Sequence, residues 1–258
     1  MLSEERKRMI LDLLQRDGKV SVIPLSRELS VSAETIRRDL DVLEKEGKLH
    51  RVYGGATNVR IQGDEPPYIQ RQSQFAQEKA QIGRKAAGLI EDGDHVVIDV
   101  GTTTLEMARA IQGKKRLTVL TNSFPVASYL MESLKQERFT GRVILLGGEL
   151  NPQQLSISGE LCQQMMKQFR VDKAFISVGG VSLEEGITDY DVHEALMSRM
   201  FADAAREAIV LADHSKIGVN TFIRIFPLEA VGTIISDAAC PKEWTRHLKK
   251  NGVVWIKA

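Results

Sequence analysis

Residues that build disulfide frameworks and zinc sites are scarce in this sequence. It contains two cysteines, Cys162 and Cys240, which lie far apart and have no partner at CxxC spacing. His193 has no second histidine at i+4. This pattern argues against a disulfide framework and matches no standard set of zinc ligands. We therefore expect two plain thiols, no metal site and no bound cofactor.

Long apolar runs and an excess of charge of one sign are also missing. No apolar run approaches the roughly 20 residues that a membrane-spanning helix needs, and the opening stretch MLSEERKRMI lacks the apolar core of a signal peptide. The formal net charge is +1, so an anionic partner has to be met by a local arrangement of charge. We expect a cytoplasmic protein that has no membrane partner.

The sequence does contain enough apolar material for a folded chain. Its 258 residues are 43% hydrophobic, and this length suits one large domain and one small domain. Near the start, apolar residues around Ile10 and Leu14 recur at helical spacing, and Ser21 and Ser32 are placed to cap two further helices. The stretch KLHRVYGGA that follows fits a small hairpin. Three short helices and a hairpin predict a winged helix-turn-helix.

The third predicted helix carries the side chain best placed to read DNA. Ile36, Leu40 and Leu43 share one narrow apolar face, and Arg38 projects almost opposite that face. In a helix-turn-helix, the N-terminal turns of this helix enter the major groove, where arginine bonds guanine edges or phosphates. The spacing therefore predicts that Arg38 leaves the domain toward DNA.

The same charges also allow a purely structural interpretation. Glu34 with Arg38, and Arg37 with Asp41, are spaced i,i+4, and such pairs stabilise exposed helices by about 0.2–0.5 kcal/mol. The preceding helix, the serine cap and the hairpin together favour DNA binding. The residues that we expect at a DNA interface are Ser21, Ser32, Glu34, Thr35, Arg37, Arg38, Arg51, Tyr53, Gly54 and Gly55.

The remainder of the chain reads as a linker and an α/β domain. The stretch TNVRIQGDEPPYIQRQSQ is polar and carries Pro66 and Pro67, which is typical of a linker. After a helix at about 75–90, short β-rich runs from HVVIDV to VVWI alternate with helical patterns. This alternation predicts a largely parallel sheet covered by helices on both faces. We expect a winged helix-turn-helix at 1–57, a linker at 58–74 and an α/β domain at 75–258.

Turns at the predicted strand ends carry the candidate ligand-binding residues. In DVGTTTLEMA, a glycine and three threonines stand where a strand hands over to a helix, which suits a phosphate, although threonines also cap helices without any ligand. Ligands of open α/β sheets bind where the carboxyl ends of the strands converge. The residues that we expect around an effector are Asp99, Gly101, Thr102, Thr103, Thr104, Thr121, Asn122, Gly148, Gly179, Gly180, Asp189, Glu194 and Lys216.

The stretch VSAETIRRDLDVLEKEGKLHRVYGGA resembles the N-terminal signature of the DeoR family of bacterial transcription regulators, VSxxTIRRDLxxLExxGxLxRxxGGA. The resemblance continues through DVGTTT, LTN, GGEL, VDKAFISVGG and DHSKIG, and so covers essentially the whole chain. It implies a double-stranded DNA operator as partner and repression of a sugar or polyol catabolic operon. It also implies a phosphorylated sugar as small-molecule effector.

In that family the C-terminal domain resembles ribose-5-phosphate isomerase. The resemblance implies that Gly101 to Thr104 form a phosphate loop and that Asp189, Glu194 and Lys216 lie near the sugar. One departure is local: after SVGG the family often shows an apolar residue and an aspartate, where this chain has Val181 and Ser182. The effector preference at that edge is left open.

Three functions are compatible with these features. The first is a regulator without enzyme activity. We expect it to be a homodimer or homotetramer, because a single small DNA-binding domain binds DNA weakly. The alternative is a sugar-phosphate isomerase with an accessory helical domain, because isomerisation also needs an acid and a base beside a phosphate site. An architectural DNA binder leaves the large α/β domain without a purpose. The sequence favours the regulator.

Overall fold

The computed structural model describes residues 3–17, 19–46, 48–52, 54–58 and 65–258. Its contacts divide the chain into two compact units, Met1–Phe75 and Ala76–Ala258, and each is described here by itself. Among the described residues, no helix is long and apolar enough to cross a membrane.

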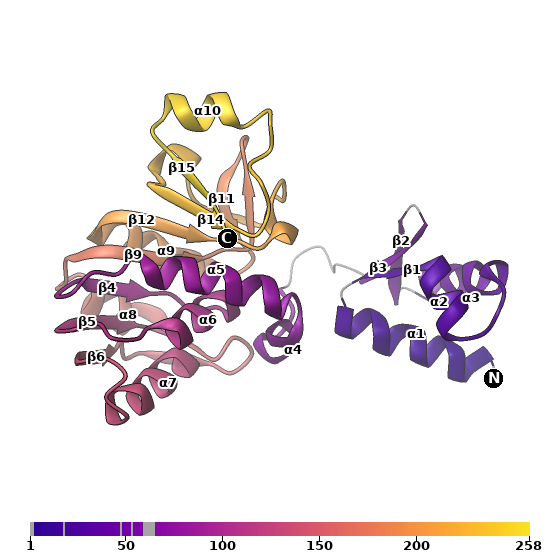
Figure 1. Cartoon of the computed structure of the whole chain (residues 1–258), viewed down its shortest axis with the longest axis horizontal. Helices are drawn as coiled ribbons and strands as arrows, with labels where there is room; N and C mark the ends of the chain where they lie inside the picture. Colours follow the sequence, from indigo (N-terminus) through magenta and orange to yellow (C-terminus); the bar gives the residue numbers. More distant parts are fainter. Residues whose placement is uncertain (1–2, 18, 47, 53, 59–64) are drawn as a thin grey trace. The chain divides into compact units, whose positions relative to one another are not determined.

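The N-terminal unit contains the predicted winged helix-turn-helix, which we call the reader (the described residues from 3 to 58). Its elements in chain order are α1 (Ser3–Asp17), β1 (Lys19–Ser21), α2 (Val22–Glu28), α3 (Ala33–Lys45), β2 (Leu49–Val52) and β3 (Gly55–Asn58) (Figure 1). Strands β2 and β3 form the hairpin, and β1 pairs antiparallel with β3, giving the order β1-β3-β2. The strand β1 was not predicted, because three residues are too few to show an alternating pattern.

A tight turn sets α3 against α2. Ser30 adopts a positive φ of 52°, and the amide of Val31 donates to the carbonyl of Ser26 at 3.0 Å. This hydrogen bond and the one from Ser30 to Arg27 close the end of α2 in the manner of a Schellman motif. The chain therefore reverses within a few residues, as a helix-turn-helix requires.

The reader is held together by an apolar core and one buried ion pair. The guanidinium of Arg6 on α1 donates Nη2 to Oδ1 of Asp39 on α3 at 3.0 Å, and its Nε lies 2.5 Å from Oδ2. Both side chains are at most 10% exposed. The hydrogen bonds to Asp39 raise the pKa of Arg6. The core beneath this pair contains Ile10, Leu14, Val20, Val22, Leu25, Leu29, Ile36, Leu40, Leu43, Leu49 and Ala56.

Part of the predicted linker is helical. Helix α4 (Tyr68–Ser73) follows Pro67, and Tyr68 is buried. The guanidinium of Arg71 pairs with Glu65 at 2.9 Å and lies 5.8 Å from the centre of the Tyr68 ring. These contacts order the part of the linker between Glu65 and Ser73.

The C-terminal unit is built on a seven-stranded parallel sheet with the order β15-β14-β12-β9-β4-β5-β6. Its strands are β4 (His95–Ile98), β5 (Leu117–Thr121), β6 (Gly141–Leu145), β9 (Val171–Ser177), β12 (Ala205–Leu211), β14 (Thr233–Ser236) and β15 (Val254–Lys257). The predicted parallel α/β fold is therefore confirmed. Inner strands such as β5 are buried along their whole length because helices cover both faces.

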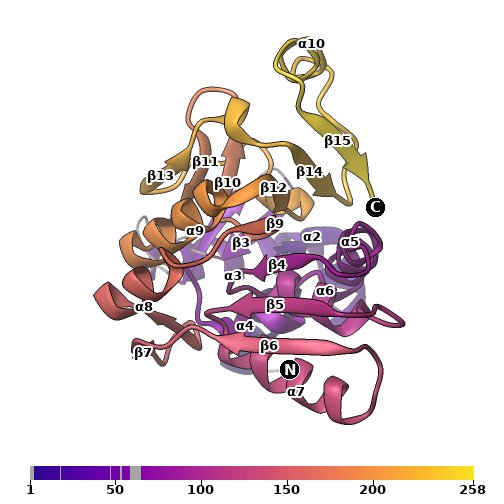
Figure 2. The ribbon, with the colours of Figure 1, turned by 90° about the vertical axis from the view of Figure 1, so that its left-hand side faces the viewer.

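Helices pack on both faces of this sheet (Figure 2). They are α5 (Ala76–Gly88), α6 (Thr102–Ala110), α7 (Phe124–Lys135), α8 (Gly159–Met166), α9 (Val192–Ala204), α10 (Thr245–Lys250) and the short turns η1 (His214–Lys216) and η2 (Leu228–Ala230). In Figure 2, α5 and α6 lie on one side of the sheet and α8 and α9 on the other. The chain adds strands outward from β4 to β6, then returns to place β9 on the other side of β4.

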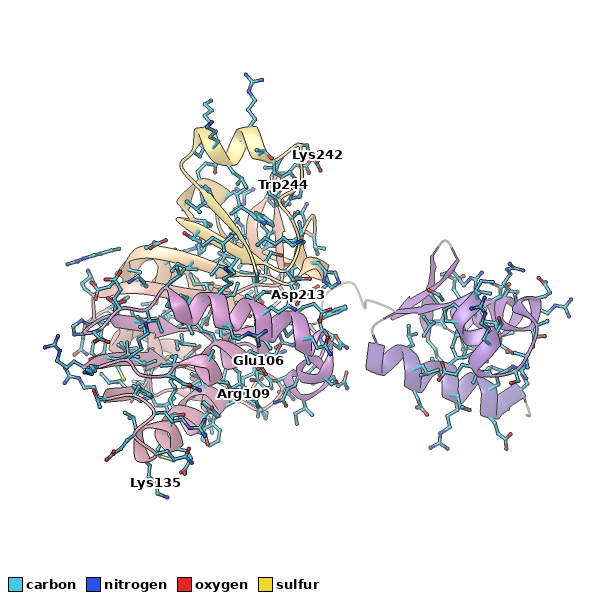
Figure 3. All side chains as sticks on the ribbon, viewed as in Figure 1. Glu106, Arg109, Lys135, Asp213, Lys242 and Trp244 are labelled. Carbon is cyan, nitrogen blue, oxygen red and sulfur yellow. The ribbon has the colours of Figure 1, made fainter. Side chains whose placement is uncertain are left out.

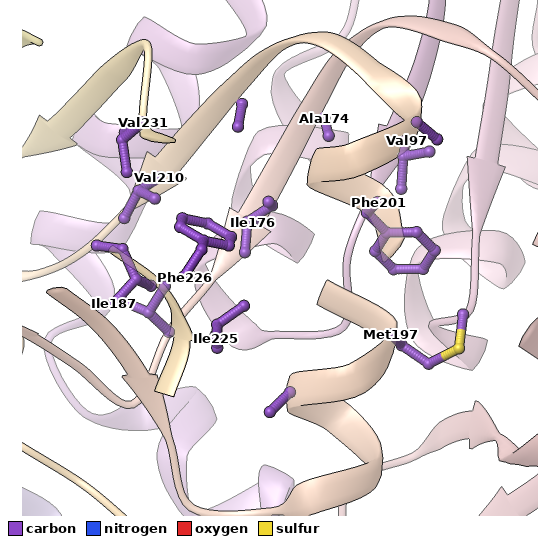
Figure 4. Packing of buried hydrophobic residues seen from close by; sticks show 14 of the residues in the cluster. Val97, Ala174, Ile176, Ile187, Met197, Phe201, Val210, Ile225, Phe226 and Val231 are labelled. Atoms are coloured by element: carbon purple, nitrogen blue, oxygen red, sulfur yellow. The ribbon is translucent and has the colours of Figure 1, made fainter. Parts of the chain in front are cut away.

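Two small antiparallel additions were not predicted from the sequence. One is a three-stranded sheet of β10 (Gly180–Ser182), β11 (Gly186–Asp189) and β13 (Ile223–Phe226), and the other pairs β7 (Glu149–Asn151) with β8 (Ser156–Ser158). The main core lies where α9 and the three-stranded sheet meet the parallel sheet. Figure 4 shows Phe201 of α9 beside Val97, and Phe226 near Ile187.

We predict that Asp39→Ala strongly destabilises the folded reader. The substitution leaves Arg6 buried without its carboxylate, and breaking such a pair costs about 3–5 kcal/mol. Amides of α1 and α3 should then exchange with deuterium at least about a hundredfold faster, measured by mass spectrometry on the full chain. Asp41→Ala on the same helix removes an exposed carboxylate and is the control. Equal protection in the two variants would contradict the role given to the Arg6–Asp39 pair.

Candidate nucleic-acid interface and effector site

The start of α3 is fixed by the predicted serine cap. The Ser32 hydroxyl accepts the amide of Thr35 at 3.1 Å and lies 2.9 Å from the Thr35 hydroxyl. Ser21 also occupies an N-cap position, before α2, but its side chain makes no capping hydrogen bond. That part of the prediction is wrong: Ser21 stands at the N-cap position without a side-chain cap, and its backbone pairs with Gly55 as the last residue of β1.

The outward face of α3 carries two arginines that share one carboxylate. Arg38 Nε lies 3.8 Å from Glu34, and Arg37 Nη1 lies 3.2 Å from the same carboxylate. The side chain of Arg38 is 80% exposed and that of Arg37 is 51% exposed. Exposed pairs of this kind are worth at most about 1 kcal/mol, so they do not hold the guanidinium groups away from an incoming phosphate or base.

The expected pair between Arg37 and Asp41 is replaced by a contact to the hairpin. Asp41 lies 3.3 Å from Nε of Arg51 on β2, and the Arg51 amide donates to Glu44 at 2.7 Å. The side chain of Arg51 is 25% exposed. Arg51 thus joins the wing to α3, because the hairpin folds back onto that helix and brings the guanidinium closer to Asp41 than Arg37 is.

The two glycines of the wing allow a turn and a close strand contact that larger residues would not. Gly54 has a positive φ of 77°, which places it in the left-handed region that favours glycine. A Cβ on Gly55 would lie 2.0 Å from the carbonyl oxygen of Val20, so a larger residue would separate β3 from β1. Tyr53 lies outside the described residues.

In the C-terminal unit, the strand order reverses between β4 and β9, and polar residues gather at the carboxyl ends of these strands. Gly101 follows β4, and a Cβ there would lie 2.3 Å from the Ser177 hydroxyl at the end of β9. Glycine therefore lets the two strand ends approach each other. Helix α6 begins immediately afterwards, with Thr102 and Thr103 only 4% and 5% exposed. The Thr104 hydroxyl donates to the Gly101 carbonyl at 3.0 Å, so this threonine serves the turn itself.

A buried carboxylate lies beside this turn. Asp99 is 1% exposed, and it accepts hydrogen bonds from the Ser198 hydroxyl at 2.6 Å and from the Val100 amide at 2.8 Å. Burial raises the pKa of Asp99 well above its ordinary value. The charges of Glu194 and Asp189 raise it further, against the hydrogen bonds from Ser198 and Val100.

Glu194 stands one helical turn before Ser198 on α9 and faces the same cluster. It accepts a hydrogen bond from the Ser156 hydroxyl of β8. Its charge and that of Asp99 also act on Cys162, whose thiol pKa rises to about 11 mainly through burial. Sequence reasoning missed Ser156 and Ser198. The i+4 spacing of Glu194 and Ser198 on one helix could have pointed to Ser198, whereas nothing local identifies Ser156.

The end of β5 contributes a buried amide. Asn122 is fully buried, and its Nδ2 donates to the Ile157 carbonyl at 3.2 Å. Its Oδ1 is buried and has no hydrogen-bond partner in the described part of the chain. The hydroxyl of the neighbouring Thr121 accepts the Ser123 amide at 3.0 Å, which positions the start of α7.

The remaining predicted residues form a second group around Tyr190. The Lys216 ammonium lies 5.6 Å from the centre of the Tyr190 ring, and a Cβ on Gly179 would lie 2.9 Å from that ring. Asp189 accepts the Tyr190 amide at 2.7 Å. A Cβ on Gly180 would lie 2.2 Å from the Val219 carbonyl, so this glycine serves close packing.

Gly148 serves close packing, since a Cβ there would lie 2.3 Å from the Ser158 carbonyl oxygen and 3.0 Å from Cβ of Cys162. Gly148 is exposed between β6 and β7. His214 contacts Asp237 at 2.7 Å through Nδ1, and His193 is exposed at the start of α9. In the described part of the chain, no group of three or more histidine, cysteine, aspartate or glutamate side chains could hold a metal ion.

Two family models match the chain. The "DeoR-like helix-turn-helix domain" matches residues 6–62, and the "DeoR C terminal sensor domain" matches residues 74–238. The chain belongs to the DeoR family of transcriptional regulators.

Curated relatives support the same assignment over nearly the whole length. The glycerol-3-phosphate regulon repressor of Escherichia coli is 32% identical, covering 93% of both chains. The transcriptional repressor GlcR of Bacillus subtilis is 34% identical over 98% of this chain and 95% of its own. The regulator GolR of Listeria innocua is 31% identical over 98% of both. These DeoR-family relatives are named as regulators, so the chain is a regulator and not the alternative isomerase.

Solved structures similar to part of the chain include ribose-5-phosphate isomerase A of Neisseria gonorrhoeae, with a TM-score of 0.40 and 16% identity over 54% of this chain and 52% of the other. A probable sor operon regulator of Shigella flexneri has a TM-score of 0.35 and 12% identity over 55% and 77%. Both TM-scores are below 0.5, so these likenesses carry no conclusion about a ligand.

For this DeoR-family sensor domain, we predict that in Asp99→Asn the free energy of unfolding falls less steeply as pH rises than it does in wild type. The raised pKa means that the folded state holds the carboxyl proton more tightly than the unfolded state does. Its contribution to stability is fully present below the unfolded pKa of about 3.9 and is lost as pH rises toward the folded pKa.

Urea unfolding of wild type and variant between pH 4 and pH 7 measures the effect of Asp99→Asn. Asp203→Asn is the control because Asp203 is exposed on α9. If the Asp99 variant lost as much stability as wild type over this range, the buried carboxyl would not be a source of that loss.

Proposed function

We propose that this DeoR-family regulator represses a sugar or polyol catabolic operon and responds to a phosphorylated sugar or polyol that binds the α/β unit. The observation that carries the DNA part is the outward, weakly paired arginine of α3, Arg38, on a capped recognition helix beside a wing. The names of the relatives support the metabolic part, because one is a repressor of a glycerol-3-phosphate regulon.

The proposed DNA interface is centred on Arg38. Arg37 and Thr35 flank it, and Glu34 holds both guanidinium groups loosely until bases or phosphates replace its carboxylate. Arg51, Gly54 and Gly55 support the interface from the wing, and Ser32 fixes the start of α3. A helix-turn-helix gains affinity and specificity from two half-sites, so we also propose that the protein acts as a homodimer or homotetramer.

The proposed effector site is the carboxyl end of the sheet near the reversal of strand order. The first amides of α6 lack partners within their own helix, and the positive end of the helix dipole favours a phosphate there. The unsatisfied Oδ1 of Asn122 is an acceptor for a sugar hydroxyl. The predicted effector residues around Tyr190, including Lys216 and Asp189, belong to the same proposal.

We expect Arg38→Ala to lower operator affinity by at least about tenfold while the fold is retained. An arginine that bonds a base or a phosphate is worth about 1–3 kcal/mol at a specific site. Fluorescence anisotropy on a duplex selected from random sequences by the wild-type protein measures the loss. Arg8→Ala, an exposed arginine of α1, is the matched control. Wild-type affinity in the Arg38 variant would exclude this residue from the interface.

For the effector, we expect phosphorylated sugars or polyols to raise the melting temperature and their unphosphorylated parents to have little effect. At a hundredfold excess over Kd, one site adds about 2.7 kcal/mol, which is roughly 5–10 °C for a chain of this size. Differential scanning fluorimetry with glycerol 3-phosphate and hexose phosphates is the measurement.

Thr103→Val should reduce the shift because it removes a hydroxyl beside the first amides of α6. Thr118→Val near the amino end of β5, away from the carboxyl ends of the strands, is the control. If no phosphorylated compound shifted the transition, or if the parents acted equally well, the proposed effector class would be wrong.

A further inference from the structure

Helix α10 is fixed to the edge of the sheet through its apolar side. Trp244, immediately before the helix, and Leu248 are 6% and 3% exposed. The ring of Trp244 meets that of Trp255 on β15 edge to face, with 6.1 Å between centroids. The indole of Trp255 donates to the Ala238 carbonyl at 3.1 Å. The orientation of α10 on the unit is therefore set by packing, and its opposite side is left to solvent.

That solvent side is strongly basic. The residues Lys242, Arg246, Lys249 and Lys250 are all exposed, and we call them the α10 basic patch (Figures 1 and 3). Over the part of the chain that the structure describes, none of the four has an ion-pair partner, although His247 between them pairs with Glu229 at 2.7 Å. Glu243 is the one acidic residue within 242–250. With four cations against this one carboxylate, the patch is a net positive region on a chain whose net charge is only +1.

Neither helix stability nor the sensor fold accounts for the patch. Cations in the last turn favour a helix C-terminus, and this covers Lys249 and Lys250 but not Lys242, which precedes the helix. The match to the sensor-domain family model ends at residue 238, before α10 begins. In addition, no large apolar side chain on α10 is exposed, which disfavours a lipid surface, because interfacial helices insert apolar residues.

We propose that the α10 basic patch binds the sugar–phosphate backbone of DNA beside the operator. The proposal rests on the proposed function, since it takes operator DNA as the partner of the reader. Double-stranded DNA carries one negative charge per roughly 1.7 Å of axis, and long lysine and arginine side chains neutralise it without reading sequence. The patch adds affinity at every sequence, while α3 supplies the choice of site.

The test is the double variant Lys249→Gln, Lys250→Gln in the full-length protein. Operator affinity is measured by anisotropy from 50 to 300 mM salt, on a duplex that extends beyond the operator. We expect about a tenfold weaker affinity at 100 mM salt and a plot of log K against log salt that is shallower by about 2. The control is Arg84→Gln, Lys85→Gln, which removes two exposed cations from the last turns of α5 and changes the net charge equally.

Trp244, immediately before α10, and Trp255 on β15 are the two tryptophans of the chain, and their rings are in contact. Intrinsic fluorescence therefore reports whether α10 still packs on the sheet in the variant. An unchanged salt slope with wild-type fluorescence would overturn the inference, and so would an equal change in the α5 control. Failure of the wild-type protein itself to select or bind any duplex would instead refute the proposed function.

Discussion

All seven strands of the main sheet run parallel, so their carboxyl ends meet at one edge. Each return of the chain then needs a crossover, which covers both faces with helices and buries the inner strands. Where the strand order reverses between β4 and β9, the connections that follow the two strands leave toward opposite faces of the sheet. Asp99 and Asn122 lie there because each directly follows a strand, α6 begins there after the turn that follows β4, and α9 brings Ser198 to the same place.

The reader depends on a different balance between buried and exposed charge. The Arg6–Asp39 pair is buried and fixes α3 against α1, whereas the pairs that Glu34 makes with Arg37 and Arg38 are exposed and weak. One set of charges therefore builds the recognition helix, and another remains available for DNA. With the α10 basic patch, this explains how a chain of net charge +1 can present local positive surfaces to an anionic partner.

Sequence reasoning succeeded where local patterns decide the outcome. The Ser32 cap, the apolar face through Ile36, Leu40 and Leu43, and the alternation of strands and helices depend on neighbouring residues, so they were readable. It failed for β1, for the capping hydrogen bond of Ser21 and for the partner of Asp41. In each case a segment distant in sequence supplied the contact: β3 pairs with β1, and the wing carries Arg51.

The fold class, the recognition helix and the family could be predicted from the sequence, because these rest on periodicity, capping residues and a nearly continuous motif. Which charges are buried and which face solvent became visible only in the packed structure. Asp39 and Asp41 stand two positions apart on one helix, yet one is buried against Arg6 and the other is exposed beside Arg51. Likewise, Asp99 meets Ser198 across 99 residues of chain. Burial depends on what packs from elsewhere, and no local pattern encodes it.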